Sequence, residues 1–406
     1  MHIKPFSALR PPPDQAAAIA APPYDVVDTA EARLIAEGNP KCFLRIARAE
    51  LELPENTDPY SGAVYQRAAD NMALFKSNGW LAPAPTPALY VYRLEKDSHA
   101  QSGVVTCCHV KDYDENRIKR HEKTRQYTED DRARHVDETN ANTGPVFLTY
   151  RDEARIDELV QAVQQNKPLY DFTAVDGVRH TVWEVRETGG LQEAFLAVPS
   201  LYVADGHHRA ASAARVARLR RDRNPRHTGD EEYNWFLTVL FPAGQLRILP
   251  YNRVVMDLNG LDVSAFLREV ESRFHVTKTD DPRPATRRHV CMYVNGAWHA
   301  LSWDADGSDD PVANLDVSVL QDRLLNPVLG IGDPRSDPRI AFVGGIRGIG
   351  ALEKRVDSGK AAVAFSMHPV TINQLLDVSD ADRIMPPKST WFEPKLRSGL
   401  LVHELE

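Results

Sequence analysis

The residues with the clearest capacity for chemistry form one short run, Asp205-Gly206-His207-His208-Arg209. An apolar stretch at 201–204 predicts a strand before it, and an alanine-rich stretch predicts a helix after it. Gly206 permits a sharp turn and close backbone approach. A helix N-terminus offers unpaired N–H groups and a positive dipole end, which suits an anion, above all phosphate. The two imidazoles and the guanidinium would add charge-assisted donors.

A plainer interpretation is that Asp205 only caps the helix and that the histidines lie on the surface. We expect capping by Asp205 in either case. Three residues that can carry positive charge oppose the dipole of a helix N-terminus unless an anion compensates them. A capping carboxylate would itself repel phosphate, so Asp205 is expected to hold Mg²⁺ or to accept a proton from a substrate hydroxyl. The small-residue face after Arg209 predicts tight packing of this helix on a sheet.

A second run, 118–132, alternates basic and acidic side chains. One interpretation is a solvated helix with ion pairs. The other takes His121, Glu122, Thr124 and Arg125 as one edge of a pocket, with Glu122 as a general base. The spacing is not His-Glu-x-x-His, which excludes a zinc protease of that type.

Prolines outnumber glycines, 28 to 22, and two of their clusters adjoin residues of interest. Pro22-Pro23 precedes Tyr24 and Asp25, and Pro386-Pro387 precedes Lys388, with Lys395 following. Ordered loops explain both segments, but a lysine of the second could also fold back onto a phosphate. Proline lowers the entropy that a loop loses when it is held over a ligand. We therefore predict that the two segments are preorganised walls of the site.

The rest of the chain must position these groups. We expect helices at 65–76, 156–163 and 207–221, and strands at 89–94, 103–110, 181–185, 201–204, 235–241 and 246–255. The pattern then restarts, with helices at 263–274, 315–325, 352–357 and 371–378, and strands at 289–294, 298–303, 340–343 and 361–366. This mixture predicts an α+β protein with domains at 1–255 and 256–406, in which the tail 385–400 returns to the active site.

Composition narrows the class of protein. The 406 residues are 42% apolar and 26% charged, as in an ordinary globular protein. The net charge is 49 − 57 = −8, which disfavours a general nucleic-acid binder. No run approaches 18 apolar residues and no signal peptide is recognised, so we expect no membrane association. The four cysteines form no Cys-x-x-Cys pair, which suits a cytoplasmic location.

Four segments, 20–27, 118–125, 202–209 and 385–400, together resemble a widespread prokaryotic family of unknown function over nearly the whole chain. The run Ala-Asp-Gly-His-His-Arg also resembles the phosphate-binding motif of free L-serine kinases of the ParB/sulfiredoxin superfamily. The resemblance implies a ParB/sulfiredoxin-like mixed core with an additional α+β C-terminal portion. It also implies ATP- or ADP-dependent phosphorylation of free L-serine to O-phospho-L-serine.

The residues that match this motif are Asp205, Gly206, His207, His208 and Arg209. We expect catalytic roles for Glu122, Asp205 and His208, and a single Mg²⁺ ligand in Asp205. Nucleotide phosphates are expected to contact Gly206, His207, His208, Arg209, Arg125 and Lys388, and the amino-acid substrate to contact Tyr24, Asp25, His121 and Thr124. We expect the C-terminal portion either to complete the pocket or to form a homodimer.

Two other functions stay open from the sequence. One is a nucleotide-binding regulator without turnover, which would use the same phosphate site. The other is a metal-dependent hydrolase that uses His121, His207 and His208 with Asp205.

Overall fold

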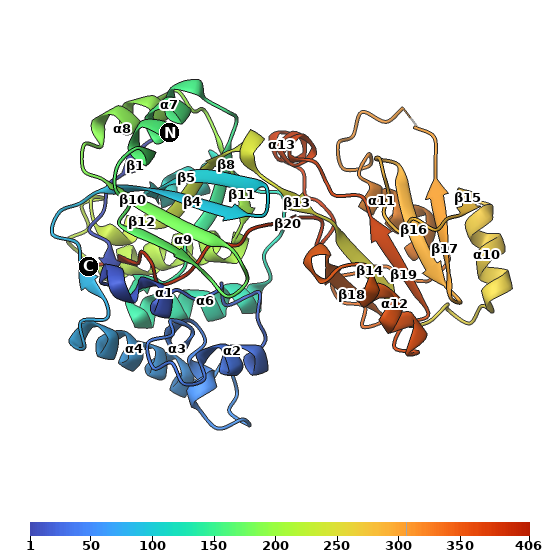
Figure 1. Ribbon diagram of the computed structural model, residues 1–406, viewed down its shortest axis with the longest axis horizontal. Helices are drawn as coiled ribbons and strands as arrows, with labels where there is room; N and C mark the ends of the chain where they lie inside the picture. The colour runs from blue at the N-terminus through green and yellow to red at the C-terminus, as the bar shows by residue number, and fades with distance from the viewer. Residues whose placement is uncertain (306) are drawn as a thin grey trace. The chain divides into compact units, whose positions relative to one another are not determined.

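The computed structural model describes residues 1–305 and 307–406 and divides them into two units (Figure 1). The first unit comprises Met1–Leu246 and Pro394–Glu406, and the second comprises Arg247–Glu393. The second unit is therefore inserted into the chain of the first, whereas the sequence predicted one boundary near residue 255. Both units combine α-helices with β-sheets, which confirms the mixed class predicted above.

A nine-stranded sheet organises the first unit in the order β6-β11-β8-β12-β5-β4-β10-β9, with β1 beside β5. β11 runs parallel to β6, and β12 runs parallel to β8, while the other neighbours are antiparallel. The strands are β1 (Ile3–Lys4), β4 (Leu89–Lys96), β5 (His99–His109), β6 (Ile118–Lys119), β8 (Val146–Tyr150), β9 (Tyr170–Thr173), β10 (Arg179–Val185), β11 (Leu201–Asp205) and β12 (Trp235–Pro242). Two small ladders pair β2 (Leu9–Arg10) with β3 (Ala82–Pro83) and β7 (Ala141–Asn142) with β21 (His403–Glu404).

One face of this sheet, the face that carries Val91, Leu148 and Val203, packs against α7, α8 and α9 in a single apolar cluster. The buried alanines of α9, among them Ala210 and Ala214, lie in that cluster, as the small-residue face predicted. α6 packs on α9, and α4 packs on α6 (Figure 1). The helices are α1 (Ala16–Ile19), α2 (Thr29–Ala36), α3 (Leu44–Ala47), α4 (Gly62–Ser77), α5 (Val110–Asp114), α6 (Gln126–Thr139), α7 (Ala154–Gln164), α8 (Gly189–Leu196) and α9 (His207–Arg223).

The second unit is built on an antiparallel six-stranded sheet of order β15-β17-β16-β19-β14-β18. α12 packs on the sheet face that carries Val254 and Ala364. A two-stranded ladder joins β13 (Ile248–Leu249) to β20 (Trp391–Phe392). The remaining elements are α10 (Val263–Glu271), α11 (Asp316–Leu320), α12 (Gly350–Asp357), α13 (Ile372–Asp380), β14 (Tyr251–Val255), β15 (His275–Lys278), β16 (His289–Val294), β17 (Ala297–Ser302), β18 (Ile340–Gly344) and β19 (Val363–Met367).

Three sequence predictions about elements need correction. The expected strand at 246–255 is two strands in different sheets, because Pro250 cannot donate to a continuous ladder. The helix at 315–325 is α11 followed by one π-helical turn, Gln321–Leu325. The charged run at 118–132 is not one helix, since β6 and a loop come first and α6 begins only at Gln126.

Candidate functional site

The junction of β11 and α9 carries the Asp205–Arg209 run, and a β-bulge decides where Asp205 points. Val203 lies opposite Leu148 on β8, but the register then shifts, so that Asp205 lies opposite Phe147. Residues opposite one another share a face, and side chains alternate along a strand. The bulge therefore turns Asp205 away from the apolar cluster of Val203 and toward the opposite face of the sheet.

Gly206 forms the turn itself. Its φ of +93° is a backbone conformation that side chains disfavour. A Cβ at this position would also lie 2.9 Å from Nε of Arg209. Gly206 is the N-cap of α9, and no side chain caps this helix, so the prediction that Asp205 is the N-cap was wrong. The left-handed turn leaves Asp205 on the strand, and among the described residues no N-cap side chain accepts from the first N–H groups of α9.

Four charged side chains of alternating sign form a chain at this turn, Asp25–Arg209–Asp205–Lys395. The guanidinium of Arg209 lies 3.6 Å from the Asp25 carboxylate and 3.5 Å from that of Asp205. Lys395 Nζ donates to Asp205 Oδ2 at 3.1 Å. Arg209 also donates to the carbonyl of Pro145, which fixes its side chain against β8. The arrangement presents two cations beside an uncapped helix N-terminus.

Asp205 remains ionised in this setting. Burial alone would raise the pKa of its carboxyl group, but the nearby Lys395 and Arg209 outweigh that effect and hold the pKa well below its usual range. A carboxylate with so low a pKa is a weak proton acceptor and a good partner for cations. This observation favours the cation-binding role of Asp205 over the proton-accepting role that the sequence left open.

His207 and His121 lie together behind the turn, with ring centres 4.5 Å apart and nearly perpendicular planes. Both side chains are buried, and burial lowers the pKa of each imidazole to about 3. They are therefore neutral at pH 7, which corrects the expectation that His207 adds positive charge to the helix end. His207 Nε2 has no hydrogen-bond partner within the described ranges.

The loop between β6 and α6 is tied to α9 through its backbone. The N–H of Arg125 donates to His208 Nε2 at 3.0 Å, so that this nitrogen carries no proton. Thr124 Oγ1 donates to Glu129 Oε2 on α6 at 3.1 Å. Glu122 is half-buried beside His121 and acts on it electrostatically, as Asp205 does. The structure thus brings Glu122 to the site, whereas Thr124 faces α6.

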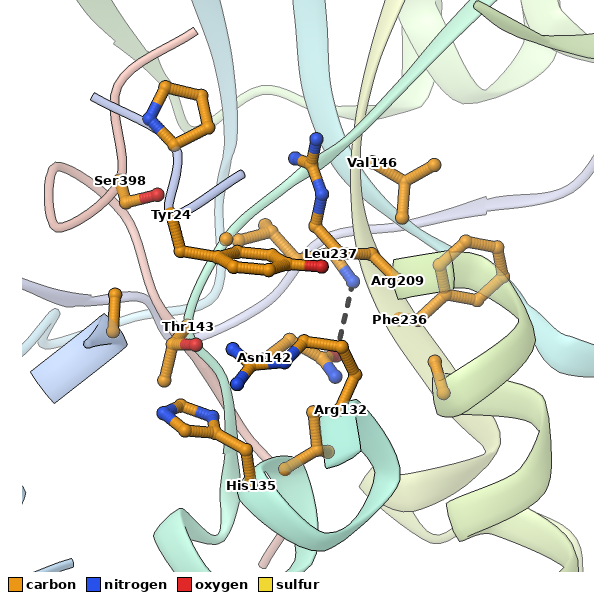
Figure 2. A pocket seen from close by; sticks show the side chains of 15 residues that line it. Tyr24, Arg132, His135, Asn142, Thr143, Val146, Arg209, Phe236, Leu237 and Ser398 are labelled. Atoms are coloured by element: carbon orange, nitrogen blue, oxygen red, sulfur yellow. Dashed lines mark hydrogen bonds between the residues drawn. The ribbon is translucent and has the colours of Figure 1, made fainter. Parts of the chain in front are cut away.

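A small pocket is lined by Arg209 together with Tyr24 and Arg132 (Figure 2). The Arg132 guanidinium lies 4.2 Å from the centre of the Tyr24 ring. Burial raises the pKa of Tyr24, and Asp25 raises it further, so the phenol keeps its proton. The free volume is about 30 Å³, enough for one or two water molecules and too small for a nucleotide.

The last segment of the first unit holds Lys395 in place through a buried polar network. Arg397 Nε donates to His180 Nε2 at 3.2 Å, and His180 Nδ1 then donates to the Tyr92 hydroxyl at 2.7 Å. Arg397 also pairs with Asp176. Tyr92 alternates with Val91, so the network lies on the sheet face opposite α9, the face toward which Asp205 points.

The same segment also binds the loop that carries Tyr24 and Asp25. Ala21 and Ser398 exchange two backbone hydrogen bonds, of 3.1 and 2.9 Å. One of the two predicted walls, the Pro22-Pro23 segment, therefore starts at a fixed point on the segment that carries Lys395. Lys388 belongs to the second unit, where its ammonium group lies 5.7 Å from the centre of the Tyr251 ring.

Sequence reasoning did not find Arg132 or Arg397. Both look like ordinary surface charges in the sequence, since Arg132 sits in a run of alternating charge and Arg397 sits in a loop. Only the tertiary structure buries them, so no local signal could have found them. Lys395 was one of two lysines that the sequence considered, and no local pattern distinguished it from Lys388.

Two properties of the described residues bear on the other function classes. No group of three or more His, Cys, Asp or Glu side chains in residues 1–305 and 307–406 is arranged to hold a metal ion. His121 and His207 meet edge to face rather than converging with Asp205 on one point, which does not favour the metal-dependent hydrolase. Within the same residues, no helix is long and apolar enough to cross a membrane.

Comparison with known proteins places the chain in a family. Residues 3–318 match the family described as Protein of unknown function (DUF1015). The chain belongs to this DUF1015 family, since the match covers well over half of it. A search of curated proteins finds no match.

Several solved structures are similar to the chain at low identity. A conserved hypothetical protein from Pyrococcus furiosus has 11% identity and a TM-score of 0.35, with 75% of this chain and 97% of that chain covered. A free serine kinase in complex with AMP has 10% identity and a TM-score of 0.36, with 73% and 92% covered. SbnI from Staphylococcus aureus, truncated at its C-terminus, has 10% identity and a TM-score of 0.39, with 73% and 86% covered.

Proposed function

We propose that this protein is a nucleotide-dependent phosphotransferase that converts free L-serine to O-phospho-L-serine. The observation that carries the proposal is the pair of cations, Arg209 and Lys395, on either side of Asp205 at the uncapped N-terminus of α9. Backbone N–H groups, a guanidinium and an ammonium group are the donors that phosphate-binding sites use. The resemblance of the Ala-Asp-Gly-His-His-Arg run to the kinase motif supports the same substrate class. A ParB/sulfiredoxin-like core is part of this proposal.

In this proposal, Lys395 and Arg209 bind the transferring phosphoryl group and stabilise the negative charge on its oxygens. Both now pair with carboxylates, so an incoming polyphosphate would exchange one anion for another at each cation. Most of the rate enhancement in phosphoryl transfer comes from such positioning and charge stabilisation. Glu122 is the proposed general base, because Asp205 is held ionised by its cations and binds protons weakly.

The proposed reaction is a substitution at phosphorus. The serine hydroxyl oxygen forms a bond to the terminal phosphorus of the nucleotide, and the bond from that phosphorus to the bridging oxygen breaks. The hydroxyl proton passes to the carboxylate of Glu122. The products are O-phospho-L-serine and the nucleotide shortened by one phosphate, which is ADP from ATP or AMP from ADP.

The site offers Mg²⁺ one protein ligand, the carboxylate of Asp205. In nucleotide sites this ion commonly takes one or two protein carboxylates and completes its shell with phosphate oxygens and water. Asp205 supplies one ionised carboxylate beside the proposed phosphate position. The ion, when bound there, would neutralise phosphate charge, while Lys395 and Arg209 would contact the remaining oxygens.

The test is incubation of the full chain with MgCl₂, L-serine and either ATP or ADP, followed by phosphorus NMR. We expect a phosphomonoester signal at the position of O-phospho-L-serine. The Lys395→Met variant should bind nucleotide roughly tenfold or more weakly, because a charged hydrogen bond is lost. Lys167→Met is the matched control, because it removes an exposed lysine on the loop between α7 and β9. This variant should leave nucleotide binding unchanged. Absence of product with both nucleotides would refute the kinase, and tight binding without product would favour a regulator.

A further inference from the structure

Arg253 is a buried cation in the second unit, and no opposite charge lies beside it among the residues that the structure describes. The side chain, on β14, is only 3% exposed. Within residues 1–305 and 307–406, its one hydrogen bond runs from an Nη atom to the carbonyl of Tyr251. Its guanidinium lies 5.5 Å from the centre of the Phe342 ring. Across the described residues of the chain, no carboxylate lies within 4 Å of this guanidinium. Burial lowers the pKa of Arg253 to about 10, so the group is still charged at pH 7.

The other strongly buried arginines show how unusual this is. Arg209 lies within 3.6 Å of two carboxylates, and Arg397 pairs with Asp176. A buried charge without a partner costs considerable stability, because neither water nor a counter-ion compensates its desolvation. An arginine that the fold leaves in this state is therefore best explained by an anion that is not part of the protein chain.

A second cation lies on the same part of the second unit. Lys388 is exposed, and its ammonium group lies 5.7 Å from the centre of the Tyr251 ring, the residue whose carbonyl Arg253 binds. Lys388 has a φ of +54°, a backbone conformation that is unfavourable for a lysine and tends to mark functional positions. Two cations from separate segments, Arg253 on β14 and Lys388 on a loop, therefore both contact Tyr251.

Aromatic rings surround these cations. Tyr251 packs edge-on against Trp391 at 5.5 Å and against Phe342 at 6.2 Å. The nearby carboxylate of Glu393 accepts a hydrogen bond from Trp391 Nε1 at 3.2 Å and so is directed to the indole. Arg253 and Tyr251 lie on the sheet face opposite Val254 and the α12 core, because side chains alternate along β14.

We propose that Arg253 and Lys388 form an oxyanion-binding site of the second unit, which takes the phosphate or carboxylate group of a small molecule. The guanidinium supplies a planar fork that matches either group, and the lysine supplies a point charge at the rim. The inference does not rest on the kinase activity and would stand if the protein transferred no phosphate.

The test measures stability and binding together on the full chain. The probes are inorganic phosphate and L-serine, each compared with NaCl at equal ionic strength, in thermal unfolding and titration calorimetry. Binding to the folded state raises the unfolding temperature. We expect Arg253→Met to be at least as stable as the wild type without ligand, because an unpaired buried charge is removed. We expect the same variant to bind the effective probe roughly tenfold or more weakly.

Three further variants complete the design. Arg335→Met removes an exposed arginine of the same unit and should keep the full response. Lys395→Met should keep the part of the response that depends on Arg253, which separates this site from the one at α9. Lys388→Met should weaken binding and leave the unliganded stability unchanged. A response to phosphate alone, or to L-serine alone, identifies the group that the site takes. The proposal is overturned if neither probe acts through Arg253, or if Arg253→Met lowers stability while binding is unchanged.

Discussion

Single residues at the β11–α9 turn hold the candidate site together by geometry as much as by charge. Gly206 supplies a conformation that no other residue adopts cheaply, and the bulge before it moves one carboxylate to the other face of the sheet. Lys395 and Arg209 then keep that carboxylate ionised. The burial of His207 removes a charge that the sequence seemed to offer.

The Gly206→Ala variant should separate backbone strain from crowding. The new methyl group would meet Arg209 at 2.9 Å and require a positive φ. We expect a loss of roughly 2–3 kcal/mol in the free energy of unfolding. Gly38→Ala is the matched control, since Gly38 has a φ of +68° and open space around it, and it should lose only about 1 kcal/mol. Urea denaturation measures the free energy of unfolding of both variants. Equal losses in the two would mean that the contact with Arg209 is unimportant.

At the scale of elements, the segment that follows β20 joins parts of the first unit that are far apart in sequence. Arg397 connects it to β4 and β10, Ser398 to the loop before Tyr24, and Val402 to Leu9 on β2. The segment has little regular structure of its own apart from β21. Its position depends on these few buried contacts, and Lys395 depends on its position.

We predict that Arg397→Gln loosens this segment without unfolding the sheet. Loss of the guanidinium leaves the buried Nε2 of His180 without its donor, at a cost of roughly 1–3 kcal/mol. Hydrogen exchange should accelerate at 394–402 and stay slow in β5 and β12. Asp176→Asn, which removes the half-exposed partner of Arg397, should cost less than about 1 kcal/mol. Uniformly faster exchange across the first unit would contradict this local role.

Elements with a strong internal period were predictable from the sequence. The three-to-four spacing of Tyr65, Ala68 and Met72 predicted α4, and the alternation at 181–185 predicted β10. The strand, turn and helix that carry Asp205–Arg209 were also predictable, while anion binding at this turn stays a prediction. The bulge and the π-helical turn were not, because each depends on contacts between residues distant in sequence. A return of the tail was predicted for 385–400, and the chain rejoins the first unit from Pro394.

For the whole molecule, buried neutral histidines make stability depend on pH. Burial lowers the pKa of His121, His207 and His180 to about 3 and that of His135 to about 4. In the unfolded chain an imidazole has a pKa near 6.5. Below that pH the unfolded chain therefore binds more protons than the folded protein, so stability falls as the solution is acidified.

We expect the free energy of unfolding to fall between about pH 6 and pH 4, by up to roughly 1.4 kcal/mol per pH unit for each such histidine. Urea denaturation at several pH values measures the slope. His135→Gln should remove the contribution of one histidine from this slope. His275→Gln, which replaces an exposed histidine, should leave the slope unchanged. A stability that is constant from pH 7 to pH 4.5 would show that these imidazoles are protonated in the folded state.

The insertion of the second unit also sets an order of events during translation. Asp205 and Lys395 are 190 residues apart, with all of Arg247–Glu393 between them. At about 5–20 residues per second, a ribosome needs roughly 10–40 seconds to pass from one to the other. Throughout that interval the nascent chain carries Asp205 and Arg209 without Lys395. The complete set of charges can therefore assemble only after Lys395 has been synthesised.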